Sequence, residues 1–255
     1  MLTVEDVSVS FGGVRAVEDV SFTIRGGEIL GLIGPNGAGK TSLLNLISGV
    51  YRPDCGRIKL LDRDITKLPP HKVAALGVGR TFQSLALFPG LTVLDNVTLG
   101  RHSRMRSGIA SCALYWGRAQ HEEASHRAAV ERIIDFLEME RIRRAPVGTL
   151  PYGLQKRVEL GRALALEPRL LLLDEPTSGM NIDEKEDVAR FILDINEEMG
   201  ITLLVVSHDI GVTMDICDRV VVLDQGKKLA EGLPEEVRAD PEVVRAYLGD
   251  ALARQ

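Results

Sequence analysis

Cysteine, long apolar runs and basic residues near the amino terminus are all scarce in this sequence. Cys55, Cys112 and Cys217 are scattered and lack the spacing of a metal site, which favours a reducing compartment. The longest apolar runs, such as residues 201–206, suit a core strand and are too short to span a membrane. Residues 1–11 carry acidic residues where a signal peptide carries basic ones. We therefore expect a cytoplasmic protein, which would need a partner if it serves a membrane.

An excess of positive charge is also absent. The chain has 31 Lys and Arg residues against 36 Asp and Glu residues, a formal net charge of −5. Because nucleic acids and anionic membrane surfaces attract basic proteins, the sequence predicts no nucleic-acid partner. A length of 255 residues, 45% of them hydrophobic, is ordinary for a soluble globular protein and sufficient for one large domain.

The first quarter of the chain alternates between strand and helix patterns. Residues 2–33 hold three short apolar stretches separated by glycine pairs, which indicates antiparallel strands with tight turns. From Lys40 the apolar period becomes helical, and residues 57–65 predict one strand.

The rest of the chain predicts an α/β domain interrupted by a helical lobe. Residues 84–166 are rich in helix signals, and strand patterns return at residues 170–174, 201–208 and 218–224. Between the first two of these strands, a helix has an apolar face made of Val188, Phe191, Ile192, Ile195 and Met199. After Gly226 we expect a β-turn and two short helices.

A glycine-rich loop matches G-x-x-x-x-G-K-[ST]. An apolar strand enters the loop and an amphipathic helix leaves it, which is the context that this motif requires. The glycines allow backbone N–H groups to point at phosphate oxygens, and the helix adds its positive N-terminal end. Lys40 is expected to reach the β- and γ-phosphates, and the Thr41 hydroxyl to ligate Mg²⁺. A chance glycine-rich turn is the alternative. The predicted phosphate-binding residues are Gly34, Pro35, Asn36, Gly37, Ala38, Gly39, Lys40, Thr41 and Ser42.

Two adjacent acidic residues, Asp174 and Glu175, end the apolar run of residues 170–173. Alternation along a strand places their side chains on opposite sides, so each can have a separate role. Asp174 is suited to hold Mg²⁺, and Glu175 is suited to polarise an attacking water. The alternative is a strand capped by acids at a turn with Pro176. The phosphate loop upstream favours the catalytic interpretation.

Further motifs, in a fixed order, resemble the ATPases of ABC transporters. Residues 150–177, LPYGLQKRVELGRALALEPRLLLLDEPT, are similar to the family's signature, of the type LSGGQ, followed by its second acidic motif. Gln83 in RTFQ resembles the Q-loop glutamine, and His208 in VVSHD resembles the switch histidine. Residues 178–181 occupy the place of the D-loop, and Phe11 the place of an aromatic that stacks on adenine. The resemblance covers essentially the whole chain.

The resemblance implies a fold and a site. The fold is an α/β P-loop NTPase of the ABC type, with a RecA-like core, an N-terminal antiparallel β subdomain and an inserted helical subdomain. One such domain would cover residues 1–255, with the helical subdomain at roughly 84–166 and a C-terminal helical tail at roughly 230–255. ATP and Mg²⁺ are the implied cofactors. Catalysis would involve Glu175, His208, Lys40 and Gln83; Mg²⁺ would involve Thr41, Gln83 and Asp174; and nucleotide binding would add Phe11 and Gly153.

Each assignment by resemblance has a plainer alternative. Gln83 would be a loop residue, His208 a strand-end histidine and Phe11 a core aromatic.

The family pattern is also not matched everywhere. Pro151 replaces the serine of the signature and offers neither a hydroxyl nor a backbone N–H, and Leu154 stands where glutamine is usual. Asn181 stands where the D-loop has aspartate.

These departures suggest a pair of unequal nucleotide sites. Gly153 and the helix N-terminus that follows remain to meet the γ-phosphate held by an opposite subunit. The chain's own loop and acids are complete. A second, different ABC ATPase is therefore favoured as partner over a symmetric homodimer.

Within the family, the closest likeness is to the ATPase subunits of branched-chain (hydrophobic) amino-acid importers. The stretches FGGVRAVEDVSF, VGRTFQ and VVRAYLGD and the tyrosine at Tyr152 carry it. It implies integral membrane permease subunits as partners, an external solute-binding protein acting indirectly, and a place on the inner face of the membrane. Other solutes, such as urea or an amide, are the alternative within the family.

Three other classes fit the sequence less well. A GTPase-like P-loop switch would need Asn or Thr followed by Lys-x-Asp, and the nearest run, residues 66–69, ends in proline. An ABC-type ATPase acting on DNA or ribosomes would need a long coiled coil or two tandem ATPase units. A module that binds ATP without turnover would not need Glu175 and His208.

Overall fold

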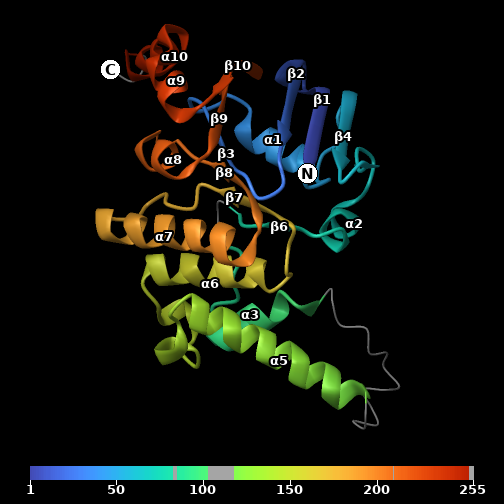
Figure 1. Cartoon of the computed structure of the whole chain (residues 1–255), viewed down its shortest axis with the longest axis vertical. Helices are drawn as coiled ribbons and strands as arrows, with labels where there is room; N and C mark the ends of the chain where they lie inside the picture. The colour runs from blue at the N-terminus through green and yellow to red at the C-terminus, as the bar shows by residue number, and fades with distance from the viewer. Residues whose placement is uncertain (83–84, 103–117, 209, 253–255) are drawn as a thin grey trace. The chain divides into compact units, whose positions relative to one another are not determined.

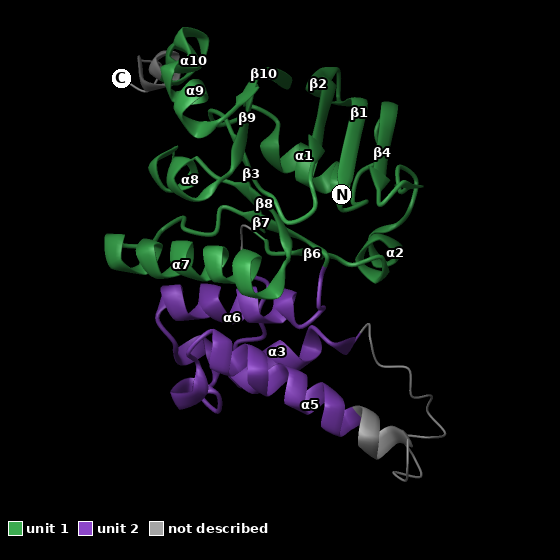
Figure 2. Cartoon of the chain, viewed as in Figure 1, with its two compact units in different colours: residues 1–83, 169–255 green, residues 84–168 purple. Residues whose placement is uncertain are grey.

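The computed structural model describes residues 1–82, 85–102, 118–208 and 210–252 (Figure 1). The chain forms two compact units, one of residues 1–83 and 169–255 and the other of residues 84–168, which Figure 2 colours green and purple. The first unit contains all the named strands, and the second unit is helical.

An antiparallel sheet of four strands, in the order β2-β1-β4-β5, lies in the first unit. Its strands are β1 (Leu2–Phe11), β2 (Val14–Ile24), β4 (Cys55–Leu60) and β5 (Arg63–Asp64). The prediction of one strand over residues 57–65 is wrong, because the chain reverses there into a hairpin. Leu61 and Asp62 both have positive φ, 48° and 64°. Such a pair of left-handed residues makes a two-residue hairpin turn.

A second sheet of six strands has the order β10-β9-β3-β8-β7-β6. Its strands are β3 (Ile29–Ile33), β6 (Val78–Arg80), β7 (Leu170–Asp174), β8 (Thr202–Val206), β9 (Arg219–Asp224) and β10 (Lys227–Gly232). All neighbours run parallel except β9 and β10.

Two sequence predictions about this sheet are corrected. The third apolar stretch of residues 2–33 forms β3, which pairs in parallel with β8 and β9 and not in an antiparallel array. All five residues of β3 are buried, as expected of a strand covered on both faces. The segment after Gly226 also begins with strand β10, not only a turn, and it pairs with β9.

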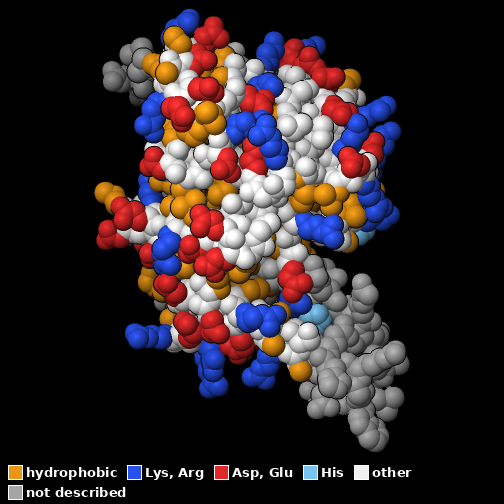
Figure 3. All heavy atoms as spheres, viewed as in Figure 1, with side chains coloured by type: hydrophobic (Ala, Val, Ile, Leu, Met, Phe, Trp, Pro, Cys, Tyr) orange, Lys and Arg blue, Asp and Glu red, His pale blue; other side chains and the backbone are white. Residues whose placement is uncertain are grey.

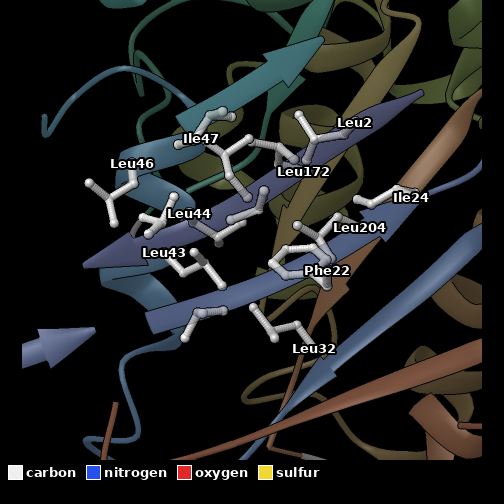
Figure 4. Close-up of a cluster of buried hydrophobic side chains, with 14 of the residues drawn as sticks. Leu2, Phe22, Ile24, Leu32, Leu43, Leu44, Leu46, Ile47, Leu172 and Leu204 are labelled. Atoms are coloured by element: carbon white, nitrogen blue, oxygen red, sulfur yellow. The ribbon is translucent and has the colours of Figure 1, made fainter. Parts of the chain in front are cut away.

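The main core of this unit lies between the two sheets and contains helix α1 (Lys40–Ile47). In Figure 4, the α1 side chains Leu43, Leu44, Leu46 and Ile47 lie among side chains of β1, β2, β3, β7 and β8. Burial of each such side chain stabilises the fold by about 1.5–3 kcal/mol. The core therefore holds α1, and the loop that precedes it, firmly against both sheets.

Helix α8 (Ile210–Ile216) covers the other face of β3. A Cβ on Gly31 would lie 2.8 Å from the Thr213 Cγ2, so the approach requires glycine there. The remaining helices of the unit are α2 (Pro70–Ala75), α7 (Ile182–Met199), α9 (Pro234–Ala239) and α10 (Pro241–Leu252).

The predicted apolar face of α7 is confirmed for four of its five residues: Val188, Phe191, Ile192 and Ile195 are buried. The prediction is wrong for Met199, which is 39% exposed. It is the last helical residue, and Gly200 follows in a left-handed conformation that ends the helix.

The second unit is built on α3 (Val93–Leu99), α5 (Arg118–Phe136) and α6 (Tyr152–Leu164), with short 3₁₀ turns at Glu140–Ile142 and Val147–Thr149. These three helices contact one another. Gly161 of α6 faces Leu137, Met139 and Val97 so closely that an added Cβ would lie 3.1–3.3 Å from their side chains. Helix α6 is therefore fixed in its own small core.

On the face that Figure 3 shows, basic and acidic side chains are interspersed. This mixture agrees with the small net charge of −5. Within the part of the chain that the structure describes, none of the helices has the length and apolar character needed to cross a membrane.

Candidate functional site

The strand order of the six-stranded sheet brings three sequence motifs together. The glycine-rich loop follows β3, Asp174 ends β7, and His208 lies two residues beyond β8. Strand β8 lies between β3 and β7, and all three run parallel. Their carboxyl ends therefore meet at one edge of the sheet, the edge at which α/β proteins bind ligands.

Two glycines of the loop pack closely against backbone carbonyl groups, and a third has open space where a side chain would be. A Cβ on Gly34 would lie 2.2 Å from the Leu223 carbonyl oxygen, and one on Gly39 would lie 2.3 Å from the Ala16 carbonyl oxygen. Gly37 has φ +83° and nothing within 4 Å of an added Cβ. The loop is thus held tightly at both ends, while its tip presents backbone without side chains, as a phosphate cradle requires.

Lys40 and the first turn of α1 line this loop. The Lys40 ammonium donates to the carbonyl oxygens of Gly34, at 2.6 Å, and Pro35, at 2.9 Å. Gly39 caps α1 without any side-chain hydrogen bond to the first turn. Thr41 is exposed and Ser42 is partly buried in that turn. The positive helix end and the lysine therefore suit an anionic ligand, and the residues present fit the phosphates of ATP.

Asp174 is buried, with 2% of its side chain exposed, and carries a network that the sequence analysis missed. Its Oδ2 lies 3.2 Å from Nη2 of Arg80, and its backbone N–H donates to the Thr81 hydroxyl. Nη1 of Arg80 donates to Asn45 Oδ1 on α1 and to Oγ of Ser48, which caps the end of α1. The available signal was a charged residue at the end of a short strand, three positions before Gln83.

Glu175 and His208 form a pair at the same edge of the sheet. Nδ1 of His208 lies 3.1 Å from Glu175 Oε1, and half of the histidine side chain is exposed. Glu175 has φ +49°, a left-handed conformation that is uncommon for a residue with a side chain. Its backbone N–H donates to the Val206 carbonyl oxygen. Strain of about 1–3 kcal/mol at such a residue is typical of functional positions.

Phe11 lies at the end of β1 and is 42% exposed. Its ring meets the Tyr51 ring edge-on, with 4.9 Å between centroids. An exposed aromatic ring is compatible with stacking on a base. The alternative interpretation, that Phe11 is a core aromatic, is wrong because the side chain is not buried.

Tyr247 of α10, within the AYLGD stretch, reaches the phosphate loop. Burial raises the pKa of its hydroxyl, and the backbone N–H of Gly34 acts in the opposite direction. The Tyr247 hydroxyl is buried near Gly34 and has no hydrogen-bond partner among the described residues.

The signature segment lies in the second unit. Pro151 is the N-cap of α6 and makes no side-chain capping bond, and Gly153 lies in the first turn, partly buried. The side-chain amide of Gln155 donates to the Leu150 carbonyl oxygen at 2.8 Å. This glutamine therefore makes a hydrogen bond at the N-terminus of its own helix.

Asn181, which stands where the D-loop has aspartate, has a structural role. The Asn181 side chain accepts a hydrogen bond from the Glu184 backbone N–H, and the Glu184 side chain accepts one from the Asn181 N–H. Asn181 therefore caps α7 as part of a capping box, a structural role that asparagine and aspartate both perform. Gln83 lies outside the described residues.

The described residues contain no group of three or more His, Cys, Asp or Glu side chains that could enclose a metal ion. Mg²⁺ is commonly held by one or two protein oxygens together with substrate phosphates and water. Asp174 and the Thr41 hydroxyl are oxygen donors of that kind, so the residues present fit Mg²⁺ carried by a nucleotide.

Comparison with protein families and curated proteins agrees with this geometry. Residues 17–178 match the ABC transporter family, and residues 227–253 match the branched-chain amino acid ATP-binding cassette transporter family. The high-affinity branched-chain amino acid transport ATP-binding protein LivG of Salmonella typhimurium is 40% identical over 98% of both chains. The corresponding protein BraF of Pseudomonas aeruginosa is 37% identical over the same shares.

Solved structures show the same fold. An ATP-binding cassette of an ABC transporter in its ADP conformation aligns with a TM-score of 0.85 and 31% identity, over 98% of both chains. A nucleotide-free cassette aligns with a TM-score of 0.84 and 30% identity, over 97% of this chain and 98% of that one. A dimeric cassette bound to ADP and Pi aligns with a TM-score of 0.77 and 27% identity, over 92% of this chain and 99% of that one.

The chain belongs to the ABC transporter family, as one of its ATP-binding subunits. It is an ATPase whose hydrolysis of ATP is coupled to transport. The expectation of an ABC-type P-loop fold is confirmed.

Proposed function

We propose that this subunit powers the import of branched-chain or other hydrophobic amino acids through a separate membrane permease. The observation that carries the ATPase part is the convergence of the phosphate loop, Asp174 and the Glu175–His208 pair at three neighbouring strand ends. The relatives LivG and BraF, alike over nearly the whole chain, support the solute class. We also propose that both units belong to one ATPase domain.

The proposed roles rest on the positions of the described side chains and, for Gln83, on the resemblance to the family alone. The loop N–H groups and Lys40 bind the phosphates, and the exposed ring of Phe11 stacks on adenine, a contact worth about 1–3 kcal/mol. Asp174, Thr41 and Gln83 hold Mg²⁺, which neutralises phosphate charge when it is bound. Glu175 accepts the proton of the attacking water, and the neighbouring His208 contacts the γ-phosphate.

We further propose that two ATPase subunits enclose two ATP molecules, each site combining one subunit's loop with the other's signature. Gly153 and the N-terminus of α6 are the part offered to the opposite subunit. The dimeric cassette bound to ADP and Pi is a precedent among similar structures. The departures at Pro151 and Leu154 favour a different ATPase as partner. The pair would lie on the cytoplasmic face of the membrane, held by the permease.

The degenerate signature yields a first prediction. Changing Pro151 to Ser and Leu154 to Gln should raise the ATPase activity of the assembled complex severalfold, because a hydroxyl and an additional N–H then meet the facing γ-phosphate. The measurement is phosphate release by purified complex. Pro151→Ala restores the backbone N–H without the hydroxyl and separates the two contributions. Unchanged or lower activity would mean that Gly153 and the helix N-terminus already suffice.

The solute class is tested by uptake. Deletion of the gene should abolish high-affinity uptake of labelled leucine, isoleucine and valine, and the wild-type gene should restore it. A gene carrying Glu175→Gln is the matched control, because it supplies a folded subunit without turnover. If uptake of these amino acids persists while urea or amide uptake is lost, the alternative solute replaces the proposed one, and the ATPase assignment stands.

A further inference from the structure

Arg80, at the end of β6, connects two parts of the nucleotide site. One guanidinium nitrogen, Nη2, lies 3.2 Å from Asp174 Oδ2. The other, Nη1, donates to Asn45 Oδ1 on α1 at 2.7 Å and to Oγ of Ser48, the C-cap residue of α1, at 2.9 Å. The Arg80 and Asp174 side chains are only 9% and 2% exposed. A buried cation therefore links the metal-binding aspartate to the helix that begins at Lys40.

Backbone pairing determines this position. Strand β6 runs parallel to β7, with Arg80 opposite Leu172. The Thr81 N–H donates to the Leu172 carbonyl oxygen, and the Asp174 N–H donates back to the Thr81 hydroxyl. The aromatic ring of Phe82 lies 5.2 Å from the Arg80 guanidinium carbon. The end of β6 and the end of β7 are thus joined by backbone and side-chain contacts at successive residues.

Stability alone is a poor explanation for this pair. Removing two charges from water costs free energy that their attraction often only offsets, and apolar replacements of such pairs are frequently neutral or stabilising. A guanidinium, however, fixes direction, because its donors form a rigid planar fork. Arg80 uses one arm of the fork for the Asp174 carboxylate and the other for α1, which also carries Thr41.

We propose that Arg80 is a positioning residue for Mg²⁺: it orients the Asp174 carboxylate and sets its place relative to Thr41 on α1. This inference rests on the proposed function, in which Asp174 and Thr41 hold the metal of Mg²⁺–ATP. Arg80 acts through Asp174 and has no contact with nucleotide in this role. Residues that orient metal ligands in this way typically change metal affinity by about 10–100-fold when they are replaced.

The test measures ATP binding to the purified subunit by equilibrium titration, in EDTA and at increasing Mg²⁺ concentration. Arg80→Met should raise the Mg²⁺ concentration that gives half of the Mg²⁺-dependent gain in affinity by about tenfold. ATP affinity in EDTA should stay within about twofold, because the phosphate loop and Lys40 are intact. Arg80→Lys keeps the charge but not the fork, so its shift should be smaller. Arg63→Met, at an exposed arginine of β5, is the control and should change neither quantity.

A double-mutant cycle distinguishes the inference from the function on which it rests. In an Asp174→Asn background, Arg80→Met should cause little further change in the Mg²⁺ requirement, because the group that it orients is already altered. If Asp174→Asn raises the Mg²⁺ requirement and Arg80→Met does not, the inference fails and the proposed metal site stands. If Asp174→Asn itself has no effect, the metal site is wrong and the inference falls with it.

A purely structural role for Arg80 would give a different result. ATP affinity would then fall equally in EDTA and in Mg²⁺, which would overturn the inference.

Asn45→Ala provides a milder variant should Arg80→Met fail to fold, because it removes one hydrogen-bond partner of the guanidinium on α1 and keeps the buried charge pair. It should shift the Mg²⁺ requirement in the same direction by about threefold, as expected for one hydrogen bond, and an unshifted requirement would contradict the inference.

Discussion

Replacing Glu175 with glutamine is expected to lower the rate of ATP hydrolysis by about 10²–10⁴ while ATP still binds. The amide keeps the size of the side chain, and it can still hydrogen-bond to His208, whose Nδ1 lies 3.1 Å from Oε1 in the wild type. It cannot accept the proton of an attacking water. Single-turnover hydrolysis and equilibrium ATP binding, measured on the same preparation, separate the chemical step from binding.

Glu186→Gln is the matched control for this prediction. Glu186 is an exposed carboxylate on α7 in the same unit, so the substitution changes net charge equally and should leave hydrolysis unchanged. Hydrolysis by Glu175→Gln at the wild-type rate would remove Glu175 from the mechanism. The left-handed backbone at Glu175 would then need an explanation in the turn alone.

Replacing Lys40 with alanine is expected to weaken ATP binding by roughly 10–100-fold and to lower turnover as well. Lys40 is 6% exposed, and its ammonium donates to the carbonyl oxygens of Gly34 and Pro35, so it lies inside the loop. A hydrogen bond to a charged group contributes about 1.5–3 kcal/mol, and the phosphates would lose such a partner. The loss should be larger for ATP than for ADP, since Lys40 is proposed to reach both the β- and the γ-phosphate.

The exposed residue Lys67 provides the control, and Lys67→Ala should leave nucleotide affinity unchanged. Thermal unfolding of both variants shows whether the loop remains folded. Equal ATP affinity in Lys40→Ala and wild type would mean that the loop of residues 34–39 does not bind the nucleotide.

Local sequence patterns predicted the elements that carry the motifs. The helix was expected from Lys40, and α1 begins there. A strand was expected at residues 170–174, and β7 covers those residues and is buried throughout. Both predictions depend on short-range properties, namely the apolar period and the glycines that a tight loop requires. The roles of the individual site residues stay predictions.

Strand pairing was less predictable. Residues 57–65 looked like one strand because Leu61 is not a typical turn residue, yet Leu61 and Asp62 both adopt left-handed conformations. After Gly226 a β-turn was expected, but residues 227–232 pair with β9 as an edge strand. Partner strands far away in the sequence decided these outcomes, and a local pattern does not contain them.

By itself, the sequence determined the family, the phosphate loop and the order of the acidic and histidine motifs, because each motif consists of residues that are adjacent in the sequence. Only the tertiary structure decided which of these motifs meet. The order β3-β8-β7 places the loop, Asp174 and His208 at one edge of the sheet. The pairing of β6 with β7 places Arg80 against Asp174, across 94 positions of sequence. Such contacts depend on long-range pairing and burial, so the position of Arg80 before Gln83 did not by itself reveal its contact with Asp174.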